Sequence, residues 1–415
     1  MAAWQPVRSL GTTAWLAAGI LFLALLHLLC CSPPVTRDAV FAPLLQYVNT
    51  TYYSSLSSSG SGRSCDYSEG RWVWAPGRAR RYNGTACGAT EGQDCVRNGR
   101  PDTGYLDWRW QPAGGCPLPA FDASAFLSAV RGKHVAFIGD SMARNQAESL
   151  FCLLSAASPH RVVDRDPETY RRHFMRWAFP THDVTVSVYW APYLARSAGK
   201  TVNYSMPYNL VYLDAPADRW AADADTMDVV VLSAGHWLLH PAVYHNGSEV
   251  IGVHAHPELN RTEIGYASPF RQAYRMAIER LSSGRARTVV LATYSPAHFE
   301  NNRLDDPTAC ARKEPYRDGE KELNKMDEEL RGIVVEEAVA EAARRSGGDV
   351  MFEVLDVTKL AAMRPDGHPG PYMNRDPFAH GVRERMQTDC LHFCLPGPVD
   401  TFNEILQQIL IKRRW

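Results

Sequence analysis

Short apolar runs alternate with amphipathic segments from about residue 120 to the end of the chain. Runs of apolar residues between turn residues predict buried strands, and apolar residues at every third or fourth position predict helices. The predicted strands are His134–Gly139, Asp228–Gly235, Arg287–Ser295 and Asp349–Val357. The predicted helices are Ser141–Leu154, Gln272–Leu281, Lys321–Arg345 and Val399–Ile411. Alternation of apolar strands with helices predicts a three-layer α/β/α domain with a central parallel sheet.

The N-terminal segment has a different pattern. No charged residue occurs from Thr12 to Cys31, and about 20 apolar residues suffice for a helix that crosses a bilayer. We therefore expect a cytosolic tail at 1–11 and one transmembrane signal anchor at 12–31. A cleaved signal peptide is the alternative, although its apolar region would be shorter. The Ser- and Gly-rich sequence that follows predicts a flexible lumenal stem at 32–63.

The cysteines that follow the predicted anchor indicate an oxidising compartment. Residues 64–119 are rich in Cys, Trp, Gly and Arg, which predicts a disulfide-stapled module ahead of the α/β domain at 120–415. The disulfide candidates are Cys65, Cys87, Cys95, Cys116, Cys152, Cys310, Cys390 and Cys394. Their even number predicts up to four disulfides, and a pairing of Cys65 with Cys116 is plausible. A zinc site at Cys390–Cys394 is the alternative, but a companion pair of ligands is missing from the sequence.

Composition and charge narrow the function further. The chain has 415 residues, of which 45% are hydrophobic and 21% charged, so wholesale disorder is excluded. A net charge of −1 is untypical of a generic nucleic-acid binder, and we expect no nucleic-acid partner. No Gly-rich nucleotide loop is evident, so we expect neither a bound cofactor nor a metal. Triplets typical of N-glycosylation start at Asn49, Asn83, Asn203, Asn246 and Asn260.

The triplet Gly139-Asp140-Ser141 joins a predicted strand to a predicted helix. Ligand sites in open α/β sheets lie at the carboxyl ends of the strands, and a helix N-terminus offers N–H groups to a developing oxyanion. A simple helix cap is the alternative. Near the other end of the chain, Asp389 and His392 lie three residues apart. A serine nucleophile requires such a base and such an orienting carboxylate.

These motifs resemble those of the GDSL/SGNH ester-hydrolase superfamily. The chain is still more similar to the plant trichome-birefringence-like family of polysaccharide O-acetyltransferases. The resemblance covers roughly residues 65–415 and rests on motifs that follow one another in this order: CDYSEGRWVW, YNGTAC, CVRNGRPD, LDWRWQP, CPLPAFD, FIGDSMARNQAESLFCLL, VVLSAGHW, RPDGHPG and DCLHFCLPGPVDTFNEIL. The stretches Phe174–Trp190 and Ser295–Glu300 look most like members assigned to xyloglucan.

The resemblance implies a Ser141–His392–Asp389 triad that carries an acetyl group by double displacement. It implies a hemicellulose acceptor in the lumen of the Golgi, for which we expect xyloglucan, and a single-pass type II membrane protein. An acetyl donor is required, either acetyl-CoA or a lumenal acetyl carrier. The oxyanion and substrate candidates are Gly139, Asp140, Arg144, Asn145, Gly235 and His236. His236 stands where superfamily relatives commonly have asparagine, so Arg144 and Asn145 are the nearest replacements.

The acceptor is expected in a groove with aromatic platforms and polar neighbours, which suit the apolar faces and hydroxyl rims of sugars. The aromatic candidates are Trp72, Trp74, Trp108, Trp110, Trp177, Trp190 and Trp237. The polar candidates are Asp107, Arg109, Arg364, Asp366 and His368, with a buried ion pair as the alternative for the last loop. Four further histidines are interpreted as structural: His134, His173, His182 and His298.

Three other functions stay open on sequence grounds. A xylan O-acetyltransferase would share most of the same motifs. An acetylesterase would use the same triad, with water in place of a sugar to resolve the acyl-serine. A glycan-binding protein with an inactive hydrolase domain is the third, although the triad is intact in this sequence.

Overall fold

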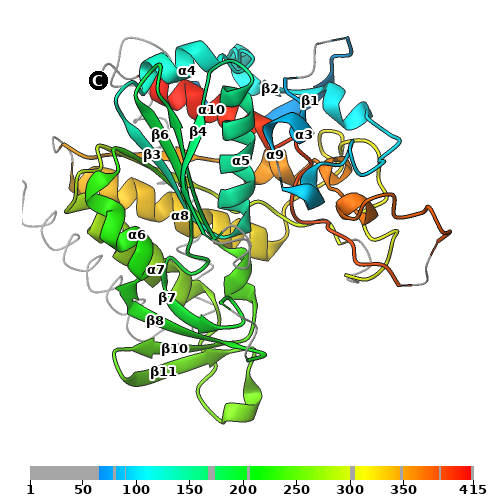
Figure 1. Cartoon of the computed structure of the whole chain (residues 1–415). Coiled ribbons are helices and arrows are strands. Elements are labelled where there is room, and N and C mark those ends of the chain that lie inside the picture. The colour runs from blue at the N-terminus through cyan, green and yellow to red at the C-terminus, as the bar shows by residue number, and fades with distance from the viewer. Residues whose placement is uncertain are drawn as a thin grey trace, which may run out of the picture. The chain divides into compact units, whose positions relative to one another are not determined.

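A mixed seven-stranded sheet forms the centre of the protein (Figure 1), in the strand order β13-β12-β9-β3-β6-β5-β4. We obtained it as a computed structural model, which describes residues 65–77, 81–88, 90–166, 173–202, 206–299, 304–345, 349–382 and 385–412. The strands are β3 (His134–Gly139), β4 (Arg161–Arg165), β5 (Phe174–Phe179), β6 (Val184–Trp190), β9 (Val229–Ser233), β12 (Thr288–Ala292) and β13 (Met351–Leu355).

The prediction of a purely parallel sheet is wrong. Neighbouring strands from β13 to β6 are parallel, but β5 pairs antiparallel with β6 and β4 pairs antiparallel with β5. The physical reason is the short turn between β5 and β6, in which Asp183 has a φ of 54°. A connection of that length joins only antiparallel neighbours, whereas parallel strands need a long crossover.

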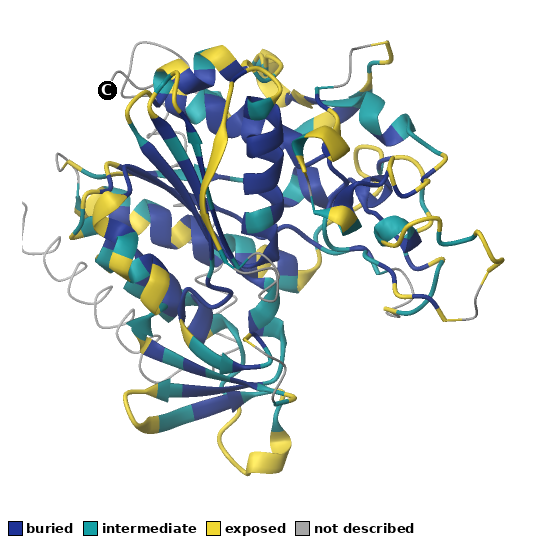
Figure 2. Cartoon of the chain, viewed as in Figure 1, coloured by how far each residue is buried: buried dark blue, intermediate teal, exposed yellow. Residues whose placement is uncertain are grey.

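Helices cover both faces of this sheet (Figure 1). On one face lie α4 (Ala123–Ala129), α5 (Ser141–Ser155) and α10 (Asp400–Ile411). On the other lie α6 (Asp218–Asp223), α7 (Ala267–Ser282) and α8 (Lys325–Arg344). Side chains of a strand alternate between the faces, and Ala136 and Ile138 of β3 accordingly pack in one cluster with Phe270 of α7 and Val334 of α8. Figure 2 shows most strands between the two helical layers as the buried core, whereas the edge strand β4 is exposed.

A second sheet extends the domain and was not predicted. Its order is β11-β10-β8-β7, and its strands are β7 (Ala195–Gly199), β8 (Asn209–Pro216), β10 (Ala242–Asn246) and β11 (Glu249–His254). The Cys-rich module contains α3 (Gly84–Cys87) and an antiparallel ribbon of β1 (Gly70–Trp74) and β2 (Trp108–Pro112). The ribbon packs on α9 (Thr358–Ala362), where the Trp72 Nε1–H donates to the Leu360 carbonyl at 2.9 Å.

The expected disulfides are confirmed. Cys87 pairs with Cys152, Cys95 with Cys394, and Cys310 with Cys390. Cys65 and Cys116 are also disulfide-bonded. The first two bridges join the module covalently to helix α5 and to the loop after His392. The module is therefore attached to the α/β domain at two points.

The expected tail, membrane anchor and stem lie outside the described residues. Within the part of the chain that the structure describes, no helix is both long enough and apolar enough to cross a membrane.

Candidate active site

The Gly139-Asp140-Ser141 triplet forms the sharp turn between β3 and α5. Gly139 has a φ of 154°, and a Cβ atom there would lie 1.7 Å from the Ser233 carbonyl oxygen, so only glycine fits. Asp140 caps α5, because its Oδ1 accepts the N–H of Met142 at 2.9 Å. Ser141 is thus the first residue of the helix, where N–H groups have no partner within the helix. This position suits a nucleophile whose own N–H stabilises an oxyanion.

Asp389 and His392 meet within one short loop. The His392 Nδ1–H donates to Asp389 Oδ2 at 2.7 Å, and Asp389 Oδ1 accepts the N–H groups of Leu391 and His392 at 3.0 and 2.9 Å. Burial alone would raise the pKa of Asp389, but the His392 charge and these hydrogen bonds lower it to about 2. The ionised carboxylate fixes the proton on Nδ1. His392 Nε2 is buried and has no hydrogen-bond partner among the described residues, so its lone pair is available to a proton.

Asn145 joins the helix of Ser141 to the loop of His392. It lies one turn after Ser141 and is fully buried. Its Oδ1 accepts the N–H of Phe393 at 3.0 Å, and its Nδ2 donates to the Phe393 carbonyl and to Gln93 Oε1, both at 3.1 Å. Both amide hydrogens are therefore occupied. The structure gives Asn145 a positioning role in place of the oxyanion contact expected from the sequence.

Three other oxyanion candidates form a frame around the turn. Asp140 Oδ2 accepts the N–H groups of Gly235 and His236 at 3.0 and 3.1 Å. The His236 Nε2–H donates to the Ser295 carbonyl at 2.9 Å, and its Nδ1 accepts the Tyr294 hydroxyl at 3.2 Å. Burial lowers the pKa of His236, against the opposing effect of Asp140. With these groups engaged, the Ser141 N–H stays the expected oxyanion donor.

Two tryptophans lie near the turn that carries Ser141. Trp190 of β6 is the register partner of Gly139, and Trp237 directly follows His236 in the chain. Their rings are 5.8 Å apart and nearly perpendicular, and both side chains are half-buried. His173 stacks on Trp190 at 5.2 Å, and the Arg144 guanidinium lies 5.8 Å from the same ring. The result is a partly exposed aromatic surface near the carboxyl ends of β6 and β9.

The other tryptophan candidates lie elsewhere. Trp110 and Trp177 are core residues, with 4% and 2% of their surface exposed, whereas Trp74 is 51% exposed. A cavity of about 130 Å³ is lined by Trp72, Trp108, Asp107, Arg109 and Arg364 together with residues of the 396–401 segment, which ends in the first turn of α10. No triad residue lines that cavity. The structure thus separates these candidates from the loop that holds Asp389 and His392.

The 364–370 loop holds the buried ion pair that was considered as its alternative interpretation. Arg364 Nε lies 2.8 Å from Asp366 Oδ1, and both side chains are buried. His368 also lies in this loop and donates through Nδ1 to the His392 carbonyl at 2.8 Å. His134 and His182 lie away from the triad, on β3 and in the β5–β6 turn. Because Cys390 and Cys394 are both in disulfides, neither offers a thiolate to zinc.

Asn83, Asn246 and Asn260 are exposed, as glycosylation sites must be. Asn49 and Asn203 lie outside the described residues. Sequence reasoning missed Tyr294 and Gln93, which orient His236 and Asn145. The short motif that begins at Ser295 directly follows Tyr294 and was the one available signal for it.

Comparison with known proteins gives two matches to family models. Residues 118–409 match the GDSL/SGNH-like acyl-esterase family found in Pmr5 and Cas1p, and residues 63–116 match the PMR5 N-terminal domain. Xyloglucan O-acetyltransferase 1 of Populus trichocarpa is 46% identical over 91% of this chain and 89% of its own length. Xyloglucan O-acetyltransferase 1 of Arabidopsis thaliana is 48% identical over 85% and 81%. Protein trichome birefringence-like 25 of Arabidopsis thaliana is 35% identical over 87% and 80%.

Proposed function

Because the chain belongs to the GDSL/SGNH-like acyl-esterase family found in Pmr5 and Cas1p and is a polysaccharide O-acetyltransferase, we propose that its acceptor is xyloglucan. The observation that carries the acceptor is the identity of 46–49% to relatives named xyloglucan O-acetyltransferase, over 84–91% of this chain. By comparison, the relative named trichome birefringence-like 25 is 35% identical to this chain.

The reaction proceeds by double displacement at Ser141. His392 Nε2 takes the hydroxyl proton while Ser141 Oγ attacks the acetyl carbonyl, and the donor leaves with that proton. A sugar hydroxyl then gives its proton to His392 and attacks acetyl-Ser141. The new ester bond forms on the sugar, the bond to Ser141 breaks, and the proton returns to Ser141. The free and buried Nε2 and the low pKa of Asp389 support this assignment.

The acceptor lies along Trp190 and Trp237 in this proposal. Indole rings offer apolar platforms to the faces of sugar rings, and these two rings are half-buried next to the turn that holds Ser141. The Arg144 guanidinium over Trp190 adds a polar rim. The balanced overall charge of the chain suits a neutral glycan.

We place the reaction in the lumen of the Golgi. Disulfides persist in oxidising compartments, and the structure holds Cys87–Cys152, Cys95–Cys394 and Cys310–Cys390. The acetyl donor is acetyl-CoA or a lumenal acetyl carrier, and the protein binds it without a resident cofactor.

The test is transfer by the full chain to de-acetylated xyloglucan, xylan and mannan oligosaccharides, with an acetyl donor and mass spectrometry of the products. We expect acetylated xyloglucan oligosaccharides from the wild type and none from Ser141→Ala. A preference for xylan would refute the acceptor. Release of acetate without acetylated oligosaccharide would identify an esterase. Full activity of Ser141→Ala would refute the triad.

A further inference from the structure

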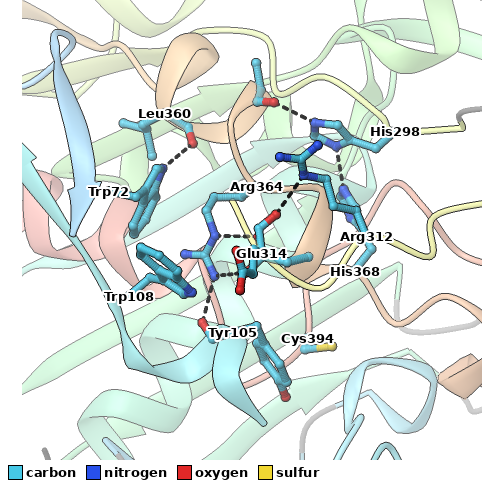
Figure 3. Close-up of polar contacts among 12 residues, drawn as sticks. Trp72, Tyr105, Trp108, His298, Arg312, Glu314, Leu360, Arg364, His368 and Cys394 are labelled. Atoms are coloured by element: carbon cyan, nitrogen blue, oxygen red, sulfur yellow. Dashed lines mark hydrogen bonds and ion pairs between the residues drawn. The ribbon is translucent and has the colours of Figure 1, made fainter. Parts of the chain in front are cut away.

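Two buried histidines form a chain of hydrogen bonds behind the proposed base. His298 lies in the loop after β12, and His368 lies in the 364–370 loop. Only 7% and 3% of their surfaces are exposed. His298 Nδ1 lies 2.7 Å from His368 Nε2, a contact that Figure 3 shows. The outer nitrogens lie 2.8 Å from the carbonyl oxygens of Ala362 and His392.

The number of hydrogens in this series of hydrogen bonds follows from the groups that it joins. A carbonyl oxygen only accepts, so His298 Nε2 and His368 Nδ1 must each carry a hydrogen. The central contact between the two rings needs one more hydrogen, on either nitrogen. The three contacts therefore hold three hydrogens, whereas two neutral imidazoles carry only two. The complete chain has one extra proton and one positive charge.

Both ends of the pair reach the loop that carries the acid and base of the triad. The backbone N–H of His298 donates to the Cys390 carbonyl at 2.9 Å. His368 bonds the His392 carbonyl and stacks on the Phe393 ring, with centroids 4.8 Å apart and planes 10° apart. The pair is thus placed to fix the backbone from which the His392 imidazole projects.

Burial limits how many protons the pair can take. It lowers the pKa of His298 to about 4 and lowers that of His368 further, because protonated His298 repels a charge on His368. These shifts oppose the first extra proton as well as a second one, whereas the three hydrogen bonds favour the first. One extra proton completes three hydrogen bonds and is the state that these contacts require. Such a pair titrates as a unit, with a pKa that belongs to neither ring alone.

The surrounding charges are mixed. The titratable and charged groups that face the pair are Lys321, Asp366, Asp389, His392, Arg100 and Arg312. Arg100 donates to the His368 carbonyl and not to its ring, and Arg312 lies over Tyr316, which packs on His298. The carboxylates of Asp366 and Asp389 favour a charge on the pair, whereas Lys321 and protonated His392 oppose it.

We propose that His298 and His368 share one extra proton and act as positioning residues for His392, which rests on the proposed role of His392 as the base. The pair acts on the base through this charge as well as through the hydrogen bond to the His392 carbonyl. A charged His392 opposes a charge on the pair, so the proton on the pair is coupled to the state of the base.

The test compares two substitutions of one residue in the full chain. His368→Asn keeps a donor near the His392 carbonyl but cannot carry the charge, whereas His368→Leu loses both. His134→Asn is the matched control, because His134 is a histidine of similar burial, 8% exposed, that bonds Ser187 and Thr226 far from this loop. For each variant, kcat and KM of acetyl transfer are measured against pH, with the melting temperature alongside.

The two roles of the pair predict separate results. In His368→Asn, the acid limb of kcat/KM should move up by about one pH unit, the effect of one charge within about 10 Å in a protein. In His368→Leu, kcat should also fall about tenfold or more at unchanged KM. The control should keep the wild-type pH profile. An unshifted acid limb in both His368 variants would overturn the shared charge.

A measurement that needs no activity separates this proposal from the proposed function. Imidazole ¹⁵N spectra of the wild-type chain report how many ring nitrogens of His298 and His368 carry hydrogens. We expect three hydrogens on the pair at pH 6.5, and loss of the signals of the His368 ring in His368→Asn. Two hydrogens at that pH would refute the proposal even if acetyl transfer is confirmed. If the pair carries three hydrogens in a protein without transferase activity, the proposal for the pair stands and the proposed function is refuted.

Discussion

Asn145 is the residue whose removal tests most sharply how the two halves of the active site are held together. Asn145→Ala breaks three buried hydrogen bonds at 3.0–3.1 Å and leaves both backbone groups of Phe393 without partners. At about 1 kcal/mol for each bond, the loss of unfolding free energy should be about 3 kcal/mol. Because Phe393 follows His392, kcat should fall about 100-fold as the base loses its position relative to Ser141.

Denaturant unfolding with the disulfides intact measures the first effect, and initial rates of acetyl transfer measure the second. Ser155→Ala is the control on the same helix, since it removes only a partly buried bond from the Ser155 hydroxyl to the Cys152 carbonyl. That variant should stay within about 0.5 kcal/mol of the wild type. A loss below about 1 kcal/mol in Asn145→Ala, or an unchanged kcat, would refute the reasoning.

Three further outcomes follow from the site. Gly139→Ala should give little folded protein, judged by soluble yield and melting temperature, because the new Cβ would lie 1.7 Å from the Ser233 carbonyl oxygen; a variant as stable as the wild type would contradict this. Asp389 has a pKa near 2, below its unfolded value, so its ionised form stabilises the fold above about pH 4 and this contribution is lost as the pH falls towards 2. The free energy of unfolding of the wild type should therefore exceed that of Asp389→Asn by about 2 kcal/mol at neutral pH, and this difference should disappear as the pH falls towards 2. A difference that does not change with pH would argue against the ion pair. Trp190→Ala should raise the KM for oligosaccharide about tenfold with a smaller change in kcat, and an unchanged KM would exclude Trp190 from the acceptor site.

The turn at Ser141 was predictable because local signals agreed there. The apolar run at His134–Gly139 gave β3 with the same bounds, and the amphipathic pattern after it gave α5 to within one residue. A glycine at the close approach to Ser233 and an aspartate as the helix cap are choices that local chemistry dictates.

The strand directions and the second sheet were not predictable in the same way. The stretch Phe174–Trp190 was noticed as a family motif, and its alternation of apolar and polar residues around a turn at Asp183 was not interpreted as a hairpin. The strands β7 and β8 carry mixed side chains that are only partly buried, so they have no strong apolar run. Their pairing depends on neighbours distant in sequence, such as β10.

The site itself divides along the same line. Asp389 and His392 are three residues apart, so their contact could be foreseen from the loop that they share. The contacts of Asn145 with Phe393 and of His368 with His298 join segments 248 and 70 residues apart. No local pattern encodes such contacts, so the sequence offered Asn145 only as one of several oxyanion candidates and His298 only as a structural histidine.

The measurement closest to the central claim is the acetyl content of Ser141 itself. The full chain is incubated with donor alone and then with xyloglucan oligosaccharide, and the peptide that contains Ser141 is analysed by mass spectrometry at each stage. The double-displacement account predicts that acetyl-Ser141 accumulates with donor alone and disappears as acetylated oligosaccharide forms. Acetylated oligosaccharide produced at the wild-type rate by Ser141→Ala, without any acetyl-enzyme, would contradict it.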